Sequence, residues 1–175
     1  NEIAWGGTRA SSFDEWIELK NNTDEQIELT GWKLSWQRDT ENPILVEFPE
    51  PGEDEDPVTI PANGFCLLER SDDQTIKNIE ADFVYTGGLS NQGEIIVLKN
   101  PEGEIIDTAR GEDGKWPAGS TLDDSLPYAS MERISFKGSP SDWTTNDGKV
   151  TNGKDAEDNT INGTPKAENS GNNSD

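Results

Sequence analysis

A chain of 175 residues suits one domain, with some length left over for loops or a tail. Its formal net charge of -22 repels phosphate backbones and anionic lipid surfaces, so we expect no nucleic-acid partner. Histidine is absent and cysteine occurs once, which removes the commonest general base and excludes a disulfide within the chain. No stretch approaches the roughly 20 apolar residues of a membrane-spanning helix, so direct membrane insertion is not expected.

The composition points in two directions. Apolar residues make up only 30% of the chain, which favours disorder, whereas six tryptophans and five phenylalanines favour a compact core. Each large aromatic side chain can bury about 150–250 Å², so a few of them suffice to anchor a fold. We therefore expect a folded part and an unfolded part.

Alternation of apolar and polar residues, the period of a β-strand, dominates the first 136 residues. In the clearest case Ile17 and Leu19 share one face of a strand, and Trp16 and Glu18 share the other. Each segment is closed by Gly, Pro or Asn, the residues that favour turns. The predicted strands lie within 15–19, 32–36, 44–48, 58–60, 65–69 and 83–85.

A hairpin is predicted over residues 94–109. Its first strand, 94–99, has apolar residues on both faces, as in a central strand of a sheet. Asn100, Pro101 and Gly103 then stand at the first, second and fourth positions of a type I turn, where these residue types are preferred. Gly103 can take the left-handed conformation of a bulge, and Ile105 begins the return strand.

Helix is scarce in this sequence. Residues 72–79 could form one or two helical turns, with aspartates near the favourable N-terminal end. After Phe136 the chain becomes rich in Asn, Asp, Gly, Ser and Thr, with Trp143 as an isolated apolar anchor. We therefore expect an irregular segment over 137–167 that packs on the folded part, and a disordered linker over 168–175. Short strands separated by turns predict an all-β sandwich or barrel for residues 1–136.

Several segments in combination resemble a known family. Residues 1–8, 14–23 and 27–34 are similar to the opening of a lamin-tail domain, which has a first strand, an acidic-Trp-Ile-Glu-Leu strand and a Leu-x-Gly-Trp-x-Leu segment. The turn at 61–65 also fits this family. Residues 130–133 and 163–170, together with Trp143, resemble the closing segments of its bacterial members.

The resemblance implies an immunoglobulin-like β-sandwich. It also implies a module of a longer polypeptide, located outside the cell or in the cell envelope, because prokaryotic relatives occur in surface and secreted proteins. Animal members end nuclear intermediate-filament proteins, but this chain has no heptad coiled-coil region. The resemblance carries over no catalytic residue, and no nucleophile with its base stands out in the sequence, so enzyme activity is not expected.

Acidic residues offer two candidate sites. Glu15 and Glu18 flank Trp16, but their odd spacing places them on opposite faces of a strand, which argues against a paired-carboxylate active site. We expect Glu18 on the exposed face, paired with a basic neighbour such as Arg133. The second candidate is an acidic loop with four oxygen donors suited to Ca²⁺, although it lacks the order of a preformed calcium loop; its residues are Glu53, Asp54, Glu55 and Asp56.

Tryptophans offer the third candidate site. Trp32 is expected in the core and Trp143 as the anchor that pins the C-terminal segment to the sandwich, whereas Trp5, Trp36 and Trp116 are candidates for an exposed binding surface. The sequence therefore predicts a non-catalytic protein-interaction or structural module without a cofactor, apart from the calcium candidate. The alternatives are a carbohydrate-binding module that uses exposed tryptophan and an accessory domain of a secreted nuclease or hydrolase.

Overall fold

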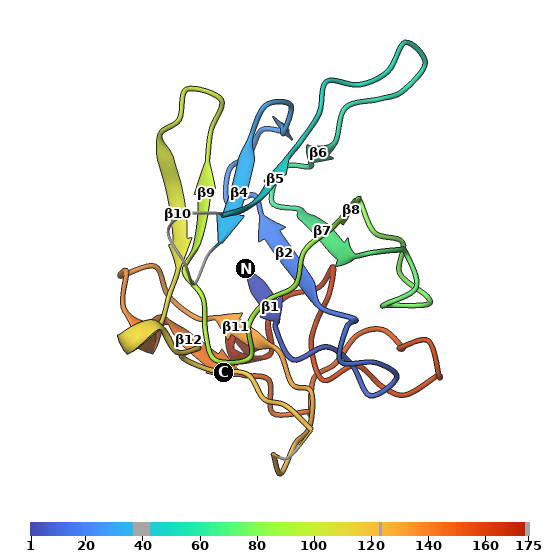
Figure 1. Ribbon diagram of the computed structural model, residues 1–175, viewed down its shortest axis with the longest axis vertical. Coiled ribbons are helices and arrows are strands. Elements are labelled where there is room, and N and C mark those ends of the chain that lie inside the picture. Colours follow the sequence, from blue (N-terminus) through green and yellow to red (C-terminus); the bar gives the residue numbers. More distant parts are fainter. Residues whose placement is uncertain (37–42, 123, 174–175) are drawn as a thin grey trace.

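Two β-sheets pack face to face in the computed structural model, which describes residues 1–36, 43–122 and 124–173 (Figure 1). One sheet has six strands in the order β12-β11-β1-β2-β7-β8, and the other has four in the order β10-β9-β4-β5. A short pair, β3 and β6, lies beside them. The strands are β1 (Glu2–Ala4), β2 (Trp16–Lys20), β3 (Ile27–Glu28), β4 (Lys33–Trp36), β5 (Ile44–Glu47), β6 (Thr59–Ile60), β7 (Phe65–Arg70), β8 (Phe83–Tyr85), β9 (Ile96–Lys99), β10 (Ile105–Ala109), β11 (Met131–Arg133) and β12 (Trp143–Thr145).

This arrangement confirms the all-β, immunoglobulin-like sandwich. The predicted alternation builds its core: Ile17 and Leu19 of β2 face Leu34 and Trp36 of β4 in one cluster of buried side chains between the sheets. The described residues contain three short 3-10 turns and no α-helix; the turns are η1 (Glu112–Gly114), η2 (Pro140–Asp142) and η3 (Ser170–Asn173). Within these ranges no helix is long and apolar enough to span a membrane.

The predicted hairpin is confirmed. Strands β9 and β10 pair antiparallel, and their register shifts between Ile105 and Asp107, as at a bulge. The Gly103 amide donates to the Asn100 carbonyl at 2.9 Å, and Gly103 has a φ of 84°, the left-handed value that a side chain would strain.

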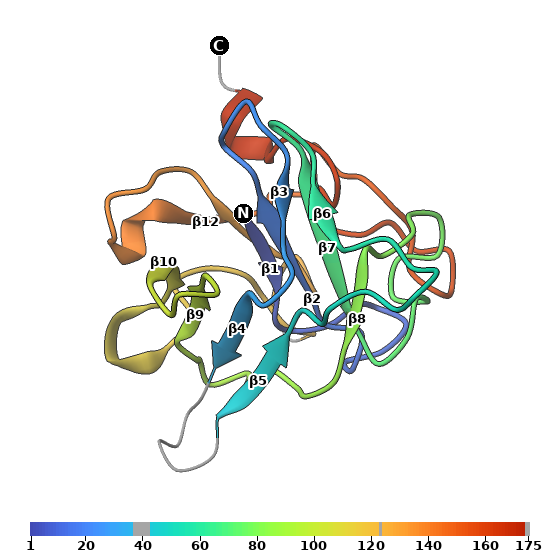
Figure 2. The ribbon, with the colours of Figure 1, turned by 90° about the horizontal axis from the view of Figure 1, so that it is seen from above.

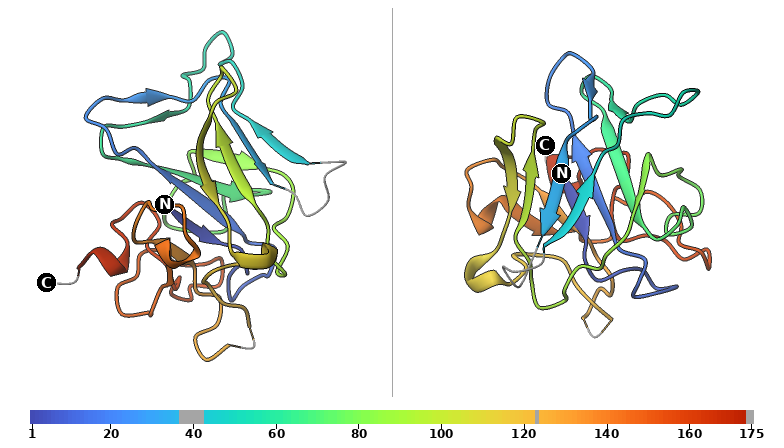
Figure 3. Two further views of the ribbon diagram at one scale, coloured as in Figure 1. Left: turned by 90° about the vertical axis from the view of Figure 1, so that its left-hand side faces the viewer. Right: turned by 45° about the horizontal axis from the view of Figure 1, so that its top comes forward.

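A third layer covers the outer face of the six-stranded sheet. Residues 161–170, here called the C-terminal strap, cross this face on the side away from the four-stranded sheet (Figures 2 and 3). Ile161 packs there with Trp16 and Leu67 in a second apolar cluster. Both faces of β2 are therefore buried: the side chains of one face pack against the four-stranded sheet, and those of the other face pack under the strap.

The predicted boundaries at the C-terminal end are wrong in two respects. The sandwich does not end at Phe136, since β12 (143–145) is an edge strand of the six-stranded sheet, paired with β11. Apart from η2, the remainder of 137–167 forms no further helix or strand, and its Ile161 packs on the outer face of the sheet. Residues 168–173 are not a disordered linker: Asn169 is buried and donates to the carbonyls of Asn1 and Arg133.

The helical turns expected at 72–79 are absent, and the stretch is a run of turns. The carboxylate of Glu69, at the end of β7, accepts hydrogen bonds from the amides of Thr75 at 3.0 Å and Ile76 at 3.1 Å. A buried carboxylate that satisfies these amides replaces the intrahelical bonds, so the chain turns without forming a helix.

Candidate functional site

Three glutamates form a row across the centre of the six-stranded sheet. Glu2 on β1 lies directly opposite Glu18 on β2 and Glu132 on β11, and all three side chains are buried under the C-terminal strap. Such opposed like charges destabilise a sheet unless they are protonated or hydrogen-bonded. Burial, followed by the charge of Glu18, raises the pKa of Glu2 to about 8, and burial raises the pKa of Glu18 to about 7.

The strap supplies hydrogen-bond donors to this row. The Thr164 amide donates to Glu2 at 2.8 Å, the Lys166 amide donates to Glu18 at 2.5 Å, and the Ser170 amide donates to Glu132 at 3.1 Å. The row of glutamates thus anchors the strap, and the donors of the strap satisfy the carboxylates of the row. Among the described residues no group of three or more Asp, Glu, Cys or His could hold a metal ion.

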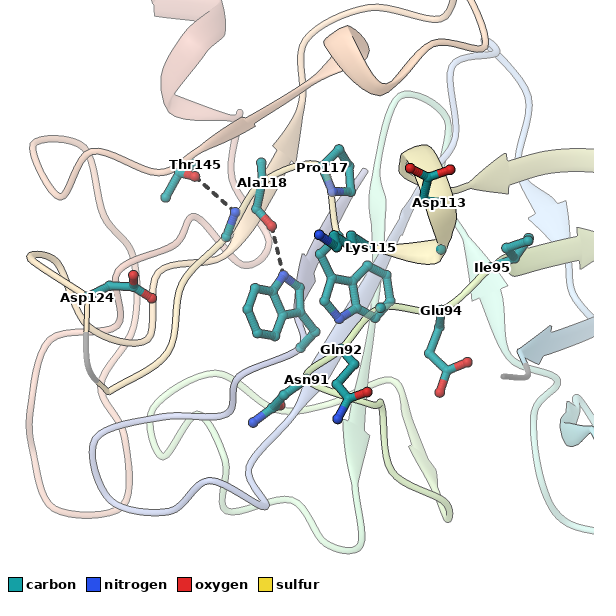
Figure 4. Close-up of a pocket in the computed structure, with 15 residues that line it drawn as sticks. Asn91, Gln92, Glu94, Ile95, Asp113, Lys115, Pro117, Ala118, Asp124 and Thr145 are labelled. Atoms are coloured by element: carbon teal, nitrogen blue, oxygen red, sulfur yellow. Dashed lines mark hydrogen bonds between the residues drawn. The ribbon is translucent and has the colours of Figure 1, made fainter. Parts of the chain in front are cut away.

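The candidate site is a pocket of about 890 Å³ at one end of the sandwich, built by loops that adjoin β1, β9, β10 and β12 (Figure 4). This volume falls in the range of about 300–1,000 Å³ that small-ligand sites occupy. Two segments and three single residues line it: 91–95 and 113–119 form most of the wall, and Trp5, Asp124 and Thr145 complete it.

Trp5 and Trp116 form the aromatic part of the pocket wall. Their rings stack with centroids 5.9 Å apart and planes only 11° from parallel. The indole N–H of Trp5 donates to the Ala118 carbonyl at 2.8 Å, and that of Trp116 donates to the Ser90 carbonyl at 2.8 Å. Because both indoles are fixed by backbone groups, the aromatic surface is pre-organised before any ligand arrives.

Two glycines let the loops approach closely. Gly93 has a φ of 112°, and a Cβ there would stand 1.8 Å from the Gly114 carbonyl oxygen of the opposite loop. Gly119 has a φ of 88°, and a Cβ there would stand 2.4 Å from Nε1 of Trp5. The shape of the pocket therefore depends on residues without side chains at both places.

Gly93→Ala is expected to lower the free energy of unfolding by about 2–4 kcal/mol, because it combines a strained φ with a backbone clash. The matched control is Gly103→Ala: Gly103 has a φ of 84° but nothing within 4 Å of a Cβ, so it should lose only about 1 kcal/mol. Urea unfolding followed by tryptophan fluorescence measures both. Equal losses in the two variants would contradict the close contact between the pocket loops.

Polar groups dominate the rest of the pocket. Figure 4 shows Asn91, Gln92 and Glu94 from the loop before β9, and Asp113 and Lys115 from the loop after β10. Asn91 and Gln92 are exposed, and their side-chain amides make no hydrogen bond with any described residue. Thr145 is occupied, since its hydroxyl accepts from the Gly119 amide at 2.9 Å. The pocket can therefore offer free amide donors and acceptors to a ligand.

Comparison with known proteins identifies the family. A family model described as Lamin Tail Domain matches residues 1–112. The chain belongs to the lamin tail domain family. Among curated proteins, no match to the chain was found. The matched residues include β1 to β10 of this lamin tail domain, whereas β11, β12, the strap and the pocket residues 113–119 lie beyond them.

The lamin tail domain brings two of the three candidate tryptophans together. Trp5 as an exposed residue is wrong, because it is 7% exposed and belongs to the core cluster, whereas Trp116 is partly buried; both line the pocket. Trp36 as an exposed binding residue is wrong: it is 1% exposed, packs edge-on against Tyr85 and donates to the Gly88 carbonyl. Its alternation with Leu34 places it on the core face. Trp32 packs against the core and Trp143 is buried in β12, as expected.

The four calcium candidates remain apart from any site. Glu53, Asp54, Glu55 and Asp56 are exposed in the loop between β5 and β6, which projects from the body of the domain (Figures 1 and 3). Glu55 accepts from the Gly52 amide at 3.3 Å, a local turn contact. Nothing in the described residues gathers these carboxylates around a common point.

The prediction that Glu18 is exposed and pairs with Arg133 is wrong. Glu18 is 1% exposed beneath the strap, and Arg133 pairs instead with Asp107 of β10 at 2.6 Å. Glu15 does lie apart from Glu18, as the odd spacing predicts, and pairs with Arg70 at 3.2 Å. The missed signal is that both faces of β2 carry large side chains, Trp16 on one and Ile17 on the other, which indicates a strand covered on both sides.

Proposed function

We propose that this lamin tail domain is a non-catalytic binding module of a larger cell-surface or secreted protein, and that it attaches that protein to an envelope component. The observation that carries the proposal is the pre-organised pocket, where a fixed pair of tryptophans adjoins free amide groups at the loop end of a rigid sandwich. A rigid scaffold that presents loops is a common arrangement for recognition.

The lining chemistry favours binding over catalysis. Its carboxylates are not paired with a nucleophile or an imidazole, since the chain has no histidine and Cys66 is buried in β7. The charge of -22 opposes attachment to nucleic acid or to anionic lipid, so we propose a partner that is neither. A location outside the cytoplasm follows the expectation drawn from the family's prokaryotic members.

A binding experiment on envelopes of the source cells tests this function. The purified chain should sediment with envelopes in a saturable manner, and Gln92→Trp, which fills the pocket from an exposed position, should reduce binding at least tenfold. Gln26→Trp places the same side chain at another exposed glutamine outside the pocket and should bind as the unmodified chain does. Binding that survives Gln92→Trp, or no saturable binding at all, would overturn the proposal.

A further inference from the structure

We propose that the pocket lined by Trp5 and Trp116 binds a neutral oligosaccharide, an inference that rests on this pocket being the binding site proposed above. Three properties of the pocket support it: the arrangement of the two indoles, the charge of the lining and the hydrogen-bonding groups that remain free. Each of these three properties excludes a different class of ligand.

The partly buried ring of Trp116, with the buried ring of Trp5 stacked against it, offers an aromatic platform. Planes 11° apart with centroids 5.9 Å apart describe two nearly parallel, offset rings. A cage for a quaternary ammonium ion needs aromatic faces that surround the cation, and parallel rings do not provide one. A sugar ring presents polarised C–H groups on one side, and these are attracted to the negative face of an indole. The geometry therefore fits a flat ring that lies against the wall.

The charge of the lining selects against anionic ligands. Three carboxylates, those of Glu94, Asp113 and Asp124, stand in the wall with one ammonium group, that of Lys115. Phosphates, sulfates and uronic acids meet a surplus of negative charge both here and over the whole chain. This surplus does not oppose a cation, which is excluded instead by the parallel arrangement of the two indoles. A ligand without charge avoids the penalty on anions.

The free polar groups match hydroxyls. A carboxamide offers two donors and an acceptor, and a sugar hydroxyl both donates and accepts, so Asn91 and Gln92 can each bind one or two hydroxyl groups. Asp113 is exposed at the rim of the pocket, and its carboxylate can accept a hydrogen bond from a sugar hydroxyl there. An apolar peptide anchor would leave these groups unpaired, which opposes its binding.

Titration of the purified chain with neutral hexasaccharides tests the inference. The probes are β-linked glucose, mannose and N-acetylglucosamine oligomers, and the readouts are calorimetry and the indole N–H resonances of Trp5 and Trp116. We expect at least one probe to bind and to shift both resonances. Asn91→Ala combined with Gln92→Ala should weaken binding about tenfold, because two exposed hydrogen bonds are lost. Gln26→Ala is the matched control and should leave the affinity unchanged.

Three further arms separate this inference from the proposed function. Choline and oligogalacturonate probe cationic and anionic ligands, and envelopes digested with protease probe a protein partner. A protein ligand is indicated if the pocket variants lose binding to envelopes, if protease treatment of the envelopes abolishes binding of the unmodified chain, and if no neutral sugar binds. That result overturns the oligosaccharide proposal and leaves the proposed binding module standing. Binding of choline or oligogalacturonate in place of neutral sugars overturns the glycan equally. If no probe and no envelope binds at the pocket, both proposals fail.

Discussion

Removal of residues 161–175 is expected to lower the free energy of unfolding by about 3–6 kcal/mol, a large part of the stability of a typical domain. The strap covers Trp16 and Leu67, and its loss exposes one face of the central strands β2 and β7 to water. It also removes the donors that bind the row of Glu2, Glu18 and Glu132. Urea unfolding monitored by tryptophan fluorescence and limited proteolysis measures the change.

The control for this truncation is removal of residues 172–175 alone. It leaves Asn169 and Ser170, whose hydrogen bonds to Asn1, Arg133 and Glu132 close the strap on the sheet. We expect its unfolding midpoint to stay within experimental error of the full chain. If the two truncated chains unfolded at the same urea concentration, the strap would contribute nothing to the sandwich.

Glu2→Gln is expected to stabilise the chain by about 2–3 kcal/mol at pH 7 and to change little at pH 4.5. The folded chain holds a proton on Glu2 because burial raises its pKa to about 8 from an ordinary value of 4.5. The geometry agrees: the single Thr164 hydroxyl lies 2.8 Å from Glu2 and 3.0 Å from Glu132, and it can donate to only one of them. A protonated Glu2 donates to that hydroxyl, which then donates to Glu132. Glutamine keeps this pattern without a titrating proton.

The pH dependence of stability follows from the same proton. Above pH 4.5 the unfolded chain releases the Glu2 proton while the folded chain keeps it, so stability falls as pH rises, by up to about 1.4 kcal/mol per pH unit until the folded pKa near 8 is reached. Glu15, Glu18 and Glu69, whose pKa values burial raises to about 7, act in the same direction.

The decisive measurement is therefore the difference between variants from pH 5 to pH 7. The free energy of unfolding of the full chain should fall over this range. For Glu2→Gln the fall should be smaller by about 1.4 kcal/mol per pH unit, the contribution of one proton. Glu53→Gln removes a carboxylate from the exposed acidic loop and should keep the slope of the full chain. Parallel slopes for the full chain and Glu2→Gln would show that Glu2 titrates normally in the folded state.

Local patterns were enough for the strands and their turns. The alternation of Ile17 and Leu19, and of Leu34 and Trp36, predicts which side chains enter the core, since the side-chain period of a strand is independent of its partners. The Asn-Pro-x-Gly turn predicts the hairpin for the same local reason. The motifs of residues 1–34 were sufficient to suggest the family that the comparison then showed.

The site depended on contacts between distant segments. Trp5 meets Trp116 across 111 positions of sequence, and only the packing of β1 against the loop after β10 decides that they stack. The alternation around Trp36 predicts which residues share its face, but not whether that face is covered. For a related reason, the sequence does not show that Glu18 lies buried beneath the strap.

The sequence by itself determined that this protein is an acidic β-sandwich of the lamin tail domain family. Strand period, turn preferences and family motifs each depend on residues that are close together in the sequence. Only the tertiary structure decided that a polar C-terminal segment is an ordered strap. Its few apolar residues could not offset the entropy of ordering it alone, but three buried carboxylates on a sheet built from residues far away supply the missing hydrogen bonds.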